Sequence, residues 1–277
     1  MSQVQLLAHS ENYTNPLIKP VELYIFIDPL CKKGFQLQSI IRRLQLQYDH
    51  YFTYRFVLST DLTSLNCYSN HMKDCTNPFS SLDISHPVLP SIAVKAAELQ
   101  GKRAGYKYLT KLQEYAMLSN KNVNSHTTLL EIAQEVQLDM AEFASDFGSK
   151  EAARAFQCDM YITREMEVDE IPSIVFFNEC IEDEGLKISG AYNFEVYEQI
   201  LRELIDEELV KNPLPTLDEL LERFGTLTTE EVAQIYTIDI AVAERELKKR
   251  MLQQKIERIT LNNTSCWKLK QVARKLR

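Results

Sequence analysis

The chain has 277 residues, of which 45% are hydrophobic and 25% charged, and only 7 are glycine. This apolar content is enough for a packed core and excludes wholesale disorder, while the few glycines favour a helix-rich fold over an all-β fold. The formal net charge of −8 argues against a nucleic-acid-binding protein, which usually carries a basic face.

The start of the chain carries no targeting signal that we recognise. Residues 1–18 contain polar residues throughout and no apolar run of signal-peptide length, and no stretch of the chain approaches the roughly 18 apolar residues of a membrane span. We therefore expect a flexible N-terminus over residues 1–19, a cytoplasmic protein and no membrane contact. In that compartment the 6 cysteines are expected as free thiols, metal ligands or redox sensors rather than structural disulfides.

The first predicted elements are a strand, a helix and a second strand. Residues 21–27 (VELYIFI) are rich in β-formers and bounded by prolines, which predicts a buried strand. Asp28 is a good N-cap and Pro29 suits the first helical position, so Cys31 is expected about one turn inside the helix. Residues 51–58 predict the second strand. The helix has an apolar and a polar side: Ile40, Ile41, Leu44 and Tyr48 against Arg42, Arg43, Gln45 and Gln47.

A helical block follows an irregular segment. Residues 59–90 are rich in serine, asparagine and proline, and a loop of that length is usually functional. Strands are then expected at 173–177 and 186–192, and a helix at 194–209. This order is that of a thioredoxin fold, with a helical insertion at about 91–168 inside a domain spanning 20–209. Within the insertion we expect helices at 91–100, 102–117, 126–137, 139–147 and 149–167.

The C-terminal part is predicted as a separate small unit. Residues 210–216 (VKNPLPT) hold two prolines and predict a linker. Residues 217–277 predict three helices, at 217–224, 229–236 and 239–253, and a strand near 256–261, which suggests a winged-helix-like domain. Arg245, Lys248, Lys249 and Arg250 crowd one helix, as in a DNA reader.

The charge of this unit favours another role. Residues 213–252 hold 5 Lys and Arg against 8 Asp and Glu, so phosphate contacts are disfavoured. We therefore expect a protein-docking or structural module and no nucleic-acid partner, with Trp267 as a packing anchor. A transcription regulator acting through this unit is the less favoured alternative.

The stretch Asp28-Pro29-Leu30-Cys31 resembles a damaged thiol-exchange site. Disulfide oxidoreductases place the first cysteine of Cys-x-x-Cys at a helix N-terminus, where its thiolate is stabilised, and a proline, typically cis, faces the pair. Here Asp28 stands in the first position, and Gly34 precludes a second pairing with Cys31. Ile171-Pro172 is the matching proline segment. The missing nucleophile argues against disulfide exchange at this site, and a thiol oxidoreductase or isomerase using Cys31 is kept as the alternative.

A metal site is the other chemistry considered. Cys67, His71 and Cys75 are spaced at four-residue intervals, but the pattern fits no common zinc module. Whether these residues bind metal or sense oxidation stays open. The sequence also lacks G-x-S-x-G, a phosphate-binding glycine loop and H-E-x-x-H, so we expect no cofactor and no enzyme.

Five stretches of the chain together match one known family: ELYIFIDPLCKKGF (22–35), VKAAELQGKRAG (94–105), CDMYITREMEV (158–168), PSIVFFNE (172–179) and EDEGLKISGAYNFEVYEQIL (182–201). On these stretches the chain resembles the YjbH (SpxH) adapters of low-GC Gram-positive bacteria, over about residues 20–270. The KKRMLQQKIERI stretch (248–259) with Trp267 is a weaker match. Some members carry further cysteines after the D-P-L-C motif and a Cys/His-rich N-terminus linked to zinc, where this chain has Lys33-Gly34 and His9.

The resemblance implies a DsbA-like thioredoxin domain used for binding. Family members bind the transcriptional regulator Spx and promote its degradation by the protease ClpXP, by making the C-terminal degron of Spx accessible. Spx is therefore the expected partner, with ClpXP contacted indirectly. By analogy with peptide binding in thioredoxins, we expect partner contacts at Asp28, Cys31, Ile171 and Pro172. The segment 59–90 is a second candidate.

Overall fold

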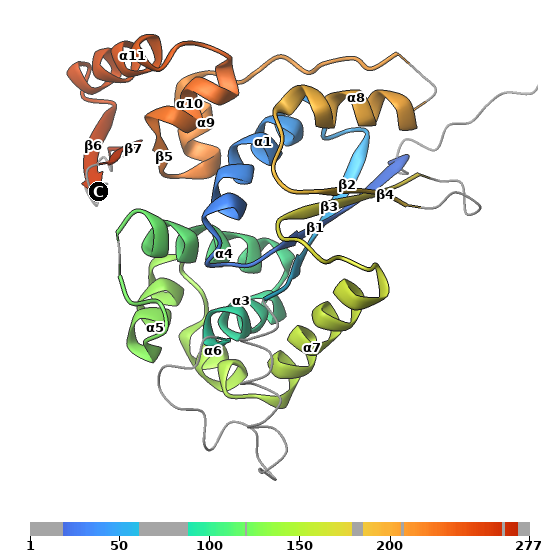
Figure 1. Ribbon diagram of the computed structural model, residues 1–277. Helices are drawn as coiled ribbons and strands as arrows, with labels where there is room; N and C mark the ends of the chain where they lie inside the picture. The colour runs from blue at the N-terminus through green and yellow to red at the C-terminus, as the bar shows by residue number, and fades with distance from the viewer. Residues whose placement is uncertain are drawn as a thin grey trace, which may run out of the picture.

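The computed structural model describes residues 19–60, 88–119, 121–178, 185–205, 208–261 and 264–270. The predicted N-terminal segment except Lys19, and Cys67, His71 and Cys75 with most of the segment 59–90, lie outside the described residues. Within them the chain forms ten helices and seven strands, which make two separate sheets (Figure 1).

The larger sheet has the topology expected of a thioredoxin fold. β1 runs parallel to β2 and antiparallel to β3, and β3 pairs antiparallel with β4. β4 ends earlier than the predicted strand over 186–192, because Gly190 turns the chain with a φ of 95°. The order is β2-β1-β3-β4, with β1 at Val21–Ile27, β2 at Phe52–Leu58, β3 at Ser173–Phe177 and β4 at Leu186–Ser189.

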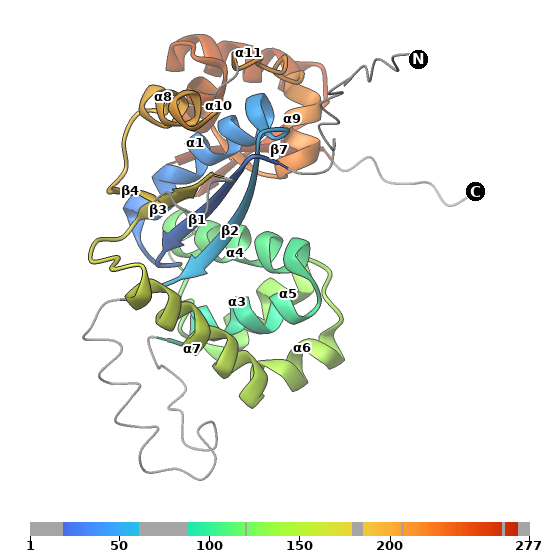
Figure 2. The same ribbon diagram turned by 90° about the vertical axis from the view of Figure 1, so that its right-hand side faces the viewer.

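The predicted helices are confirmed to within a few residues at each end. In Figures 1 and 2, α3 to α7 gather below the sheet, whereas α1 and α8 lie above it. The helix expected over 194–209 ends earlier, because the backbone at Ile205 is extended. The bounds are α1 (Lys32–Tyr48), α3 (Leu89–Leu99), α4 (Lys102–Met117), α5 (His126–Glu135), α6 (Met140–Phe147), α7 (Lys150–Glu165) and α8 (Phe194–Leu204).

Alternate residues of β1 face two different hydrophobic clusters. Ile25 packs in the large cluster that also contains Leu37 and Ile41 of α1. Phe26 packs in a second cluster with Val168, which follows α7. All of these side chains except Val168, which is 9% exposed, have at most 3% of their surface exposed. A strand covered on both faces needs this continuous apolar run, which explains why VELYIFI predicted β1 so clearly.

Replacing Gly105 with alanine is expected to lower the free energy of unfolding by about 1–2 kcal/mol, because overpacking between α3 and α4 outweighs the gain in helix propensity. A Cβ at Gly105 would overlap the Glu98 side chain and lie 3.1 Å from Glu98 Cα. Glu98 is restrained, since Lys95 Nζ lies 2.7 Å from its Oε2. Urea unfolding measures the effect. Gly148→Ala, where the added Cβ meets nothing within 4 Å, is the control, and equal stability of the two variants would contradict the expectation.

The C-terminal residues form three helices and a three-stranded sheet of order β5-β7-β6. Trp267 of β7 is fully buried, and its Nε1 donates to Thr229 Oγ1 at 2.9 Å, which agrees with its predicted anchoring role. The element order fits the expected helices and hairpin, while the winged-helix assignment stays a prediction. The bounds are α9 (Leu217–Phe224), β5 (Leu227–Thr228), α10 (Thr229–Tyr236), α11 (Ile240–Leu252), β6 (Ile256–Leu261) and β7 (Thr264–Leu269).

The segment between α8 and the C-terminal helices is hydrogen-bonded to the end of α1 and the residues just after it. Asn212 N donates to Gln47 O at 2.9 Å, and Val210 N donates to the Tyr51 hydroxyl at 3.0 Å. The predicted linker over 210–216 has no regular secondary structure in its described residues. Among the helices of the described ranges, none combines the length and apolar character needed to cross a membrane.

Candidate partner-binding site

The turn after β1 differs from the predicted helix start. Asp28 does not cap α1: its Oδ1 accepts from Leu30 N at 2.7 Å, and its carbonyl accepts from Cys31 N at 3.0 Å. Residues 28–31 therefore form a tight turn of their own, and α1 begins at Lys32 with Cys31 as its N-cap. The prediction that Cys31 lies one turn inside the helix was wrong, because an aspartate followed by proline also suits a turn.

The proline segment lies beside this turn. Ser173 pairs with Phe26 in the sheet, which places Ile171-Pro172 opposite the end of β1. The peptide bond between Ile171 and Pro172 is cis, as in the thiol-exchange arrangement that the sequence suggested. Pro172 is buried, whereas Ile171, Asp28 and Cys31 are half-buried. The four predicted site residues thus come from two adjacent segments at one end of the sheet.

The thiol chemistry at this turn is incomplete. Cys31 is half-buried and is a free thiol. Its side chain makes no capping hydrogen bond, and the place of a second thiol one turn along is taken by buried Gly34. A carboxylate at Asp28 cannot form a mixed disulfide, so this turn offers one sulfur at most and cannot resolve such an intermediate by itself.

The other described cysteines predict a clear difference in reactivity. Cys158 is exposed on α7, whereas burial raises the pKa of the Cys266 thiol to about 12. With this pKa, only about one Cys266 side chain in ten thousand is deprotonated at pH 8, and the thiolate is the reactive form. We expect iodoacetamide at pH 8 to modify Cys158 within minutes and Cys266 only in denaturant. Mass spectrometry of tryptic peptides gives the readout, and equal labelling of both would contradict this.

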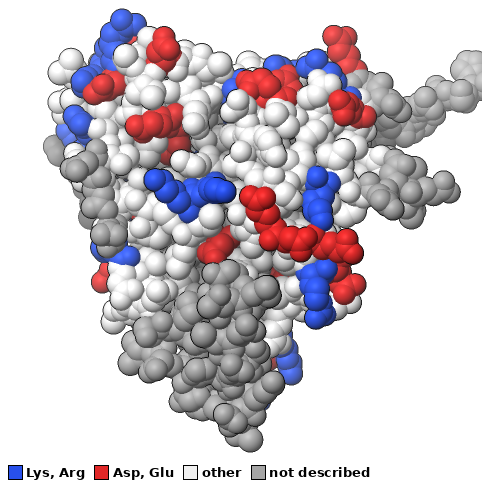
Figure 3. Space-filling model, in the orientation of Figure 1, with Lys and Arg blue, Asp and Glu red and all other residues white. Residues whose placement is uncertain are grey.

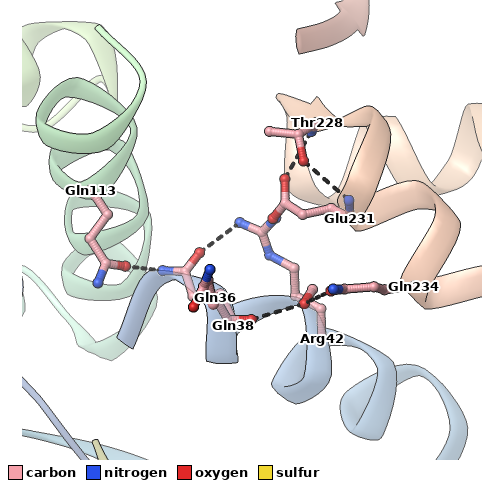
Figure 4. Close-up of polar contacts among 8 residues, drawn as sticks. Gln36, Gln38, Arg42, Gln113, Thr228, Glu231 and Gln234 are labelled. Carbon is pink, nitrogen blue, oxygen red and sulfur yellow. Dashed lines mark hydrogen bonds and ion pairs between the residues drawn. The ribbon is translucent and has the colours of Figure 1, made fainter. Parts of the chain in front are cut away.

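A buried polar junction joins α1 to the C-terminal part (Figure 4). Arg42 is 2% exposed, its Nη1 lies 2.6 Å from Glu231 Oε1 of α10, and its Nη2 donates to Gln38 Oε1 at 3.1 Å. Gln38 donates in turn to Gln113 of α4. Ser39, one residue along α1, donates to Gln234 of α10. One face of α1 therefore contacts both α4 of the helical insertion and α10 of the C-terminal part.

The charges of this junction are held in place. Burial disfavours the charged form of Arg42, but Glu231, Tyr106 and Glu114 together outweigh this and raise the pKa of the guanidinium above its ordinary value. Glu231 Oε2 also accepts from Thr228 N at 2.8 Å, which closes the capping box of α10. The guanidinium further lies 5.0 Å from the centre of the Phe224 ring. Because the guanidinium of Arg42 has all of these contacts, it holds α1 and α10 in a fixed relative position.

Sequence reasoning missed this junction. The helical pattern separated a polar side of α1 from its apolar side, but it did not predict that Arg42, Gln45 and Gln47 of the polar side are buried. The pattern Thr228-x-x-Glu231 is a capping-box signal, and it would have located the start of α10 and its carboxylate. No signal in the sequence pairs that carboxylate with Arg42, because the two residues are far apart in the chain.

The basic residues of α11 are paired rather than free. Lys248 lies 2.8 Å from Glu244, Lys249 lies 2.6 Å from Glu246, and Arg250 Nη1 lies 3.0 Å from an oxygen of Asp218. On the face drawn in Figure 3, basic and acidic side chains are interspersed and form no broad basic area. These pairs weaken the attraction of α11 for phosphate.

Comparisons with known proteins place the chain in a family. A sequence model of the thioredoxin family matches residues 24–199. The chain is 36% identical over 272 residues to the ClpXP adapter protein SpxH of Bacillus subtilis, covering 90% of this chain and 89% of the relative. It is 38% identical over 273 residues to a protein of the same name from Shouchella clausii, covering 93% and 91%. The chain belongs to the SpxH family. Since the SpxH relatives cover more than the thioredoxin match, the likeness extends beyond that domain.

Solved structures support the fold alone. One is a candidate protein disulfide isomerase from Nitrosomonas europaea, with a TM-score of 0.53 at 15% identity, covering 67% of this chain and 97% of that one. Another is α-DsbA1 of Wolbachia pipientis, with a TM-score of 0.50 at 11% identity, covering 67% and 86%. The DsbA-like thioredoxin fold is thereby confirmed for this member of the SpxH family.

Proposed function

We propose that this chain is an adapter that binds Spx and promotes its degradation by the ClpXP protease, without catalysing a reaction. The observation that carries the proposal is the likeness to SpxH proteins over nine-tenths of the chain. The turn at residues 28–31 supports it, because it provides one thiol at most beside the cis peptide bond before Pro172. Such an adapter works in the cytoplasm.

The adapter needs only a difference in affinity between two conformers of its client. If it binds the conformer of Spx with an exposed degron more tightly than the other, it raises the population that the protease can engage. The surface beside the cis peptide bond, from Asp28 and Cys31 to Ile171 and Pro172, is our proposed contact for Spx. The adapter itself then touches ClpXP only through the client.

A reconstituted degradation assay tests the proposal. Purified Spx, ClpXP and ATP are combined with and without this protein, and the half-life of Spx is measured. We expect the half-life to shorten several-fold in its presence. An unrelated substrate with its own ClpXP tag is the control and should be degraded at the same rate in both reactions. An unchanged Spx half-life would refute the adapter function.

Replacing Cys31 with serine is expected to leave the rate of Spx degradation within about twofold of the wild-type rate. Serine is close in size to cysteine and retains N-cap capacity, so α1 should begin at the same residue. A thiol oxidoreductase or isomerase using Cys31 would lose all activity, because the sulfur is the nucleophile. The same assay gives the readout, and a collapse of Spx turnover would favour that enzyme.

A further inference from the structure

A groove lies where the two parts of the molecule meet, on the same side of α1 as the junction with α10. Its volume is about 770 Å³, and it is lined by α1, the start of α8, one side of α10 and the start of α11. Neither part forms the groove alone, since its walls come from both. Its shape therefore depends on the contacts of α1 with α10, among them the hydrogen bond from Ser39 to Gln234.

The floor and walls of the groove contain apolar side chains that are open to solvent. Ile240, the first residue of α11, is 55% exposed, and Ile238 beside it is 37% exposed. Val196 at the start of α8, next to the lining residues, is 38% exposed. Large apolar side chains exposed together in a concave surface are typical of a binding site for another molecule.

The rim of the groove is acidic. Glu195, Glu230 and Asp239 line it from three different helix starts, all three residues are exposed, and none forms an ion pair with a described residue. The one basic lining residue, Arg43, is already engaged: its guanidinium lies 3.7 Å from the centre of the Phe194 ring and it donates to Gln47 and to the carbonyl of Gln234. The groove thus combines open apolar surface with an excess of negative charge, of which Arg43 balances a part at Glu195.

The groove also adjoins the proposed contact at the cis peptide bond. Gly190 N donates to Pro172 O at 2.7 Å, and the chain then runs through Tyr192, which is 50% exposed, to Asn193 and Phe194 in the groove wall. A partner that covers the turn at residues 28–31 can therefore continue into the groove without leaving the surface.

We propose that this groove docks a short segment of Spx in which an apolar side chain is flanked by lysine or arginine. The apolar side chain would contact Ile238 and Ile240, and the basic groups would lie against the carboxylates of Glu195, Glu230 and Asp239. Apolar contact supplies affinity, and the complementary charge sets the orientation and excludes acidic segments. The inference rests on the proposed function and identifies the client segment and the surface that receives it.

Binding of purified Spx to charge-reversed variants tests the acidic rim. Glu195→Lys/Glu230→Lys is expected to raise the Kd for Spx at least about tenfold, because like charges then face each other across the contact. The matched control is Glu165→Lys/Glu222→Lys, which reverses two exposed carboxylates on α7 and α9, outside the groove lining, and should leave the Kd unchanged. Thermal unfolding of each variant verifies that it is folded.

The apolar contact is tested by two substitutions on one helix. Ile240→Ser is expected to raise the Kd about fivefold, whereas Leu252→Ser, which removes a side chain that is 77% exposed at the far end of α11, should not. A Kd within twofold of wild type for both the double charge reversal and Ile240→Ser would overturn the inference. If those variants bind normally while the wild type still shortens the Spx half-life, the adapter function stands without this groove.

Photo-crosslinking identifies the chemistry of the bound segment. A benzoylphenylalanine placed at position 238 is irradiated with purified Spx, and the adduct is located by mass spectrometry. We expect attachment to a segment of Spx that carries lysine or arginine next to an apolar residue. Attachment to an acidic segment, or to a second copy of this chain alone, would overturn the assignment. Failure of the wild type to bind Spx at all would remove the proposed function as well.

Discussion

Replacing Arg42 with methionine is expected to lower the free energy of unfolding by about 3–5 kcal/mol, the usual cost of removing one partner from a buried ion pair. The substitution leaves the Glu231 carboxylate, which lies 2.6 Å from the guanidinium and is mostly buried, without its counter-charge. It also removes the donor to Gln38. Since Arg42 connects α1 with α10, the loss should weaken the seating of the whole C-terminal part. Urea unfolding followed by fluorescence of Trp267 measures it.

A double variant separates the lost charge balance from lost packing. In Arg42→Met/Glu231→Gln, the buried negative charge is gone, while the glutamine oxygen can still accept from Thr228 N in the capping box. We therefore expect the double variant to be more stable than Arg42→Met by at least about 1 kcal/mol. A double variant no more stable than the single one would mean that the ion pair is not the cause.

Replacing Lys95 with methionine is expected to lower the free energy of unfolding by about 3 kcal/mol. Lys95 Nζ lies 2.5 Å from Asp159 Oδ2, and the two side chains are 2% and 0% exposed. Asp159 also accepts from Leu58 N at 2.9 Å, so it joins α7 to the end of β2. Arg55 remains as a partner of Asp159 at 3.1 Å, which keeps the expected loss at the lower end of the range for buried pairs.

The control for this prediction is an ion pair on the surface. Lys121 and Glu131 lie 3.1 Å apart but are 46% and 57% exposed, so Lys121→Met should change the free energy of unfolding by less than about 1 kcal/mol. Parallel urea titrations of the two lysine variants give the comparison. Equal losses would show that burial of the Lys95 pair does not set its contribution.

Much of the fold was predictable because local pattern and final structure agree. The run VELYIFI and the stretch SIVFF became β1 and β3 with the predicted bounds, since buried strands of this fold are continuously apolar. Several helices of the block after residue 88 begin directly after a glycine or a serine, namely Gly101 before α4, Ser125 before α5 and Ser149 before α7, and these residue types favour helix ends. Such signals depend on neighbouring residues only, so the sequence contains them in full.

The candidate site was less predictable, because it depends on contacts between distant residues. The turn at Asp28 was interpreted as a helix cap, and the structure uses the same carboxylate to close a turn of its own. The pattern of α1 separated a polar side from an apolar one, but it did not predict that Arg42 and Gln45 of the polar side are buried, or that Arg42 pairs with Glu231 of the C-terminal part. Helical periodicity distinguishes two sides of a helix and does not say which partner each will meet.

The helix α1 contributes side chains to two hydrophobic cores. Leu37, Ile41 and Leu44 belong to the core of the thioredoxin part, whereas Leu46, two residues further, belongs to the core of the C-terminal part. Because one helix contributes to both cores, unfolding of either core should destabilise the other. We therefore expect the two parts on either side of the segment 210–216 to unfold as a single cooperative unit. A chain cut after α8 would leave the buried polar strip of α1 open to solvent.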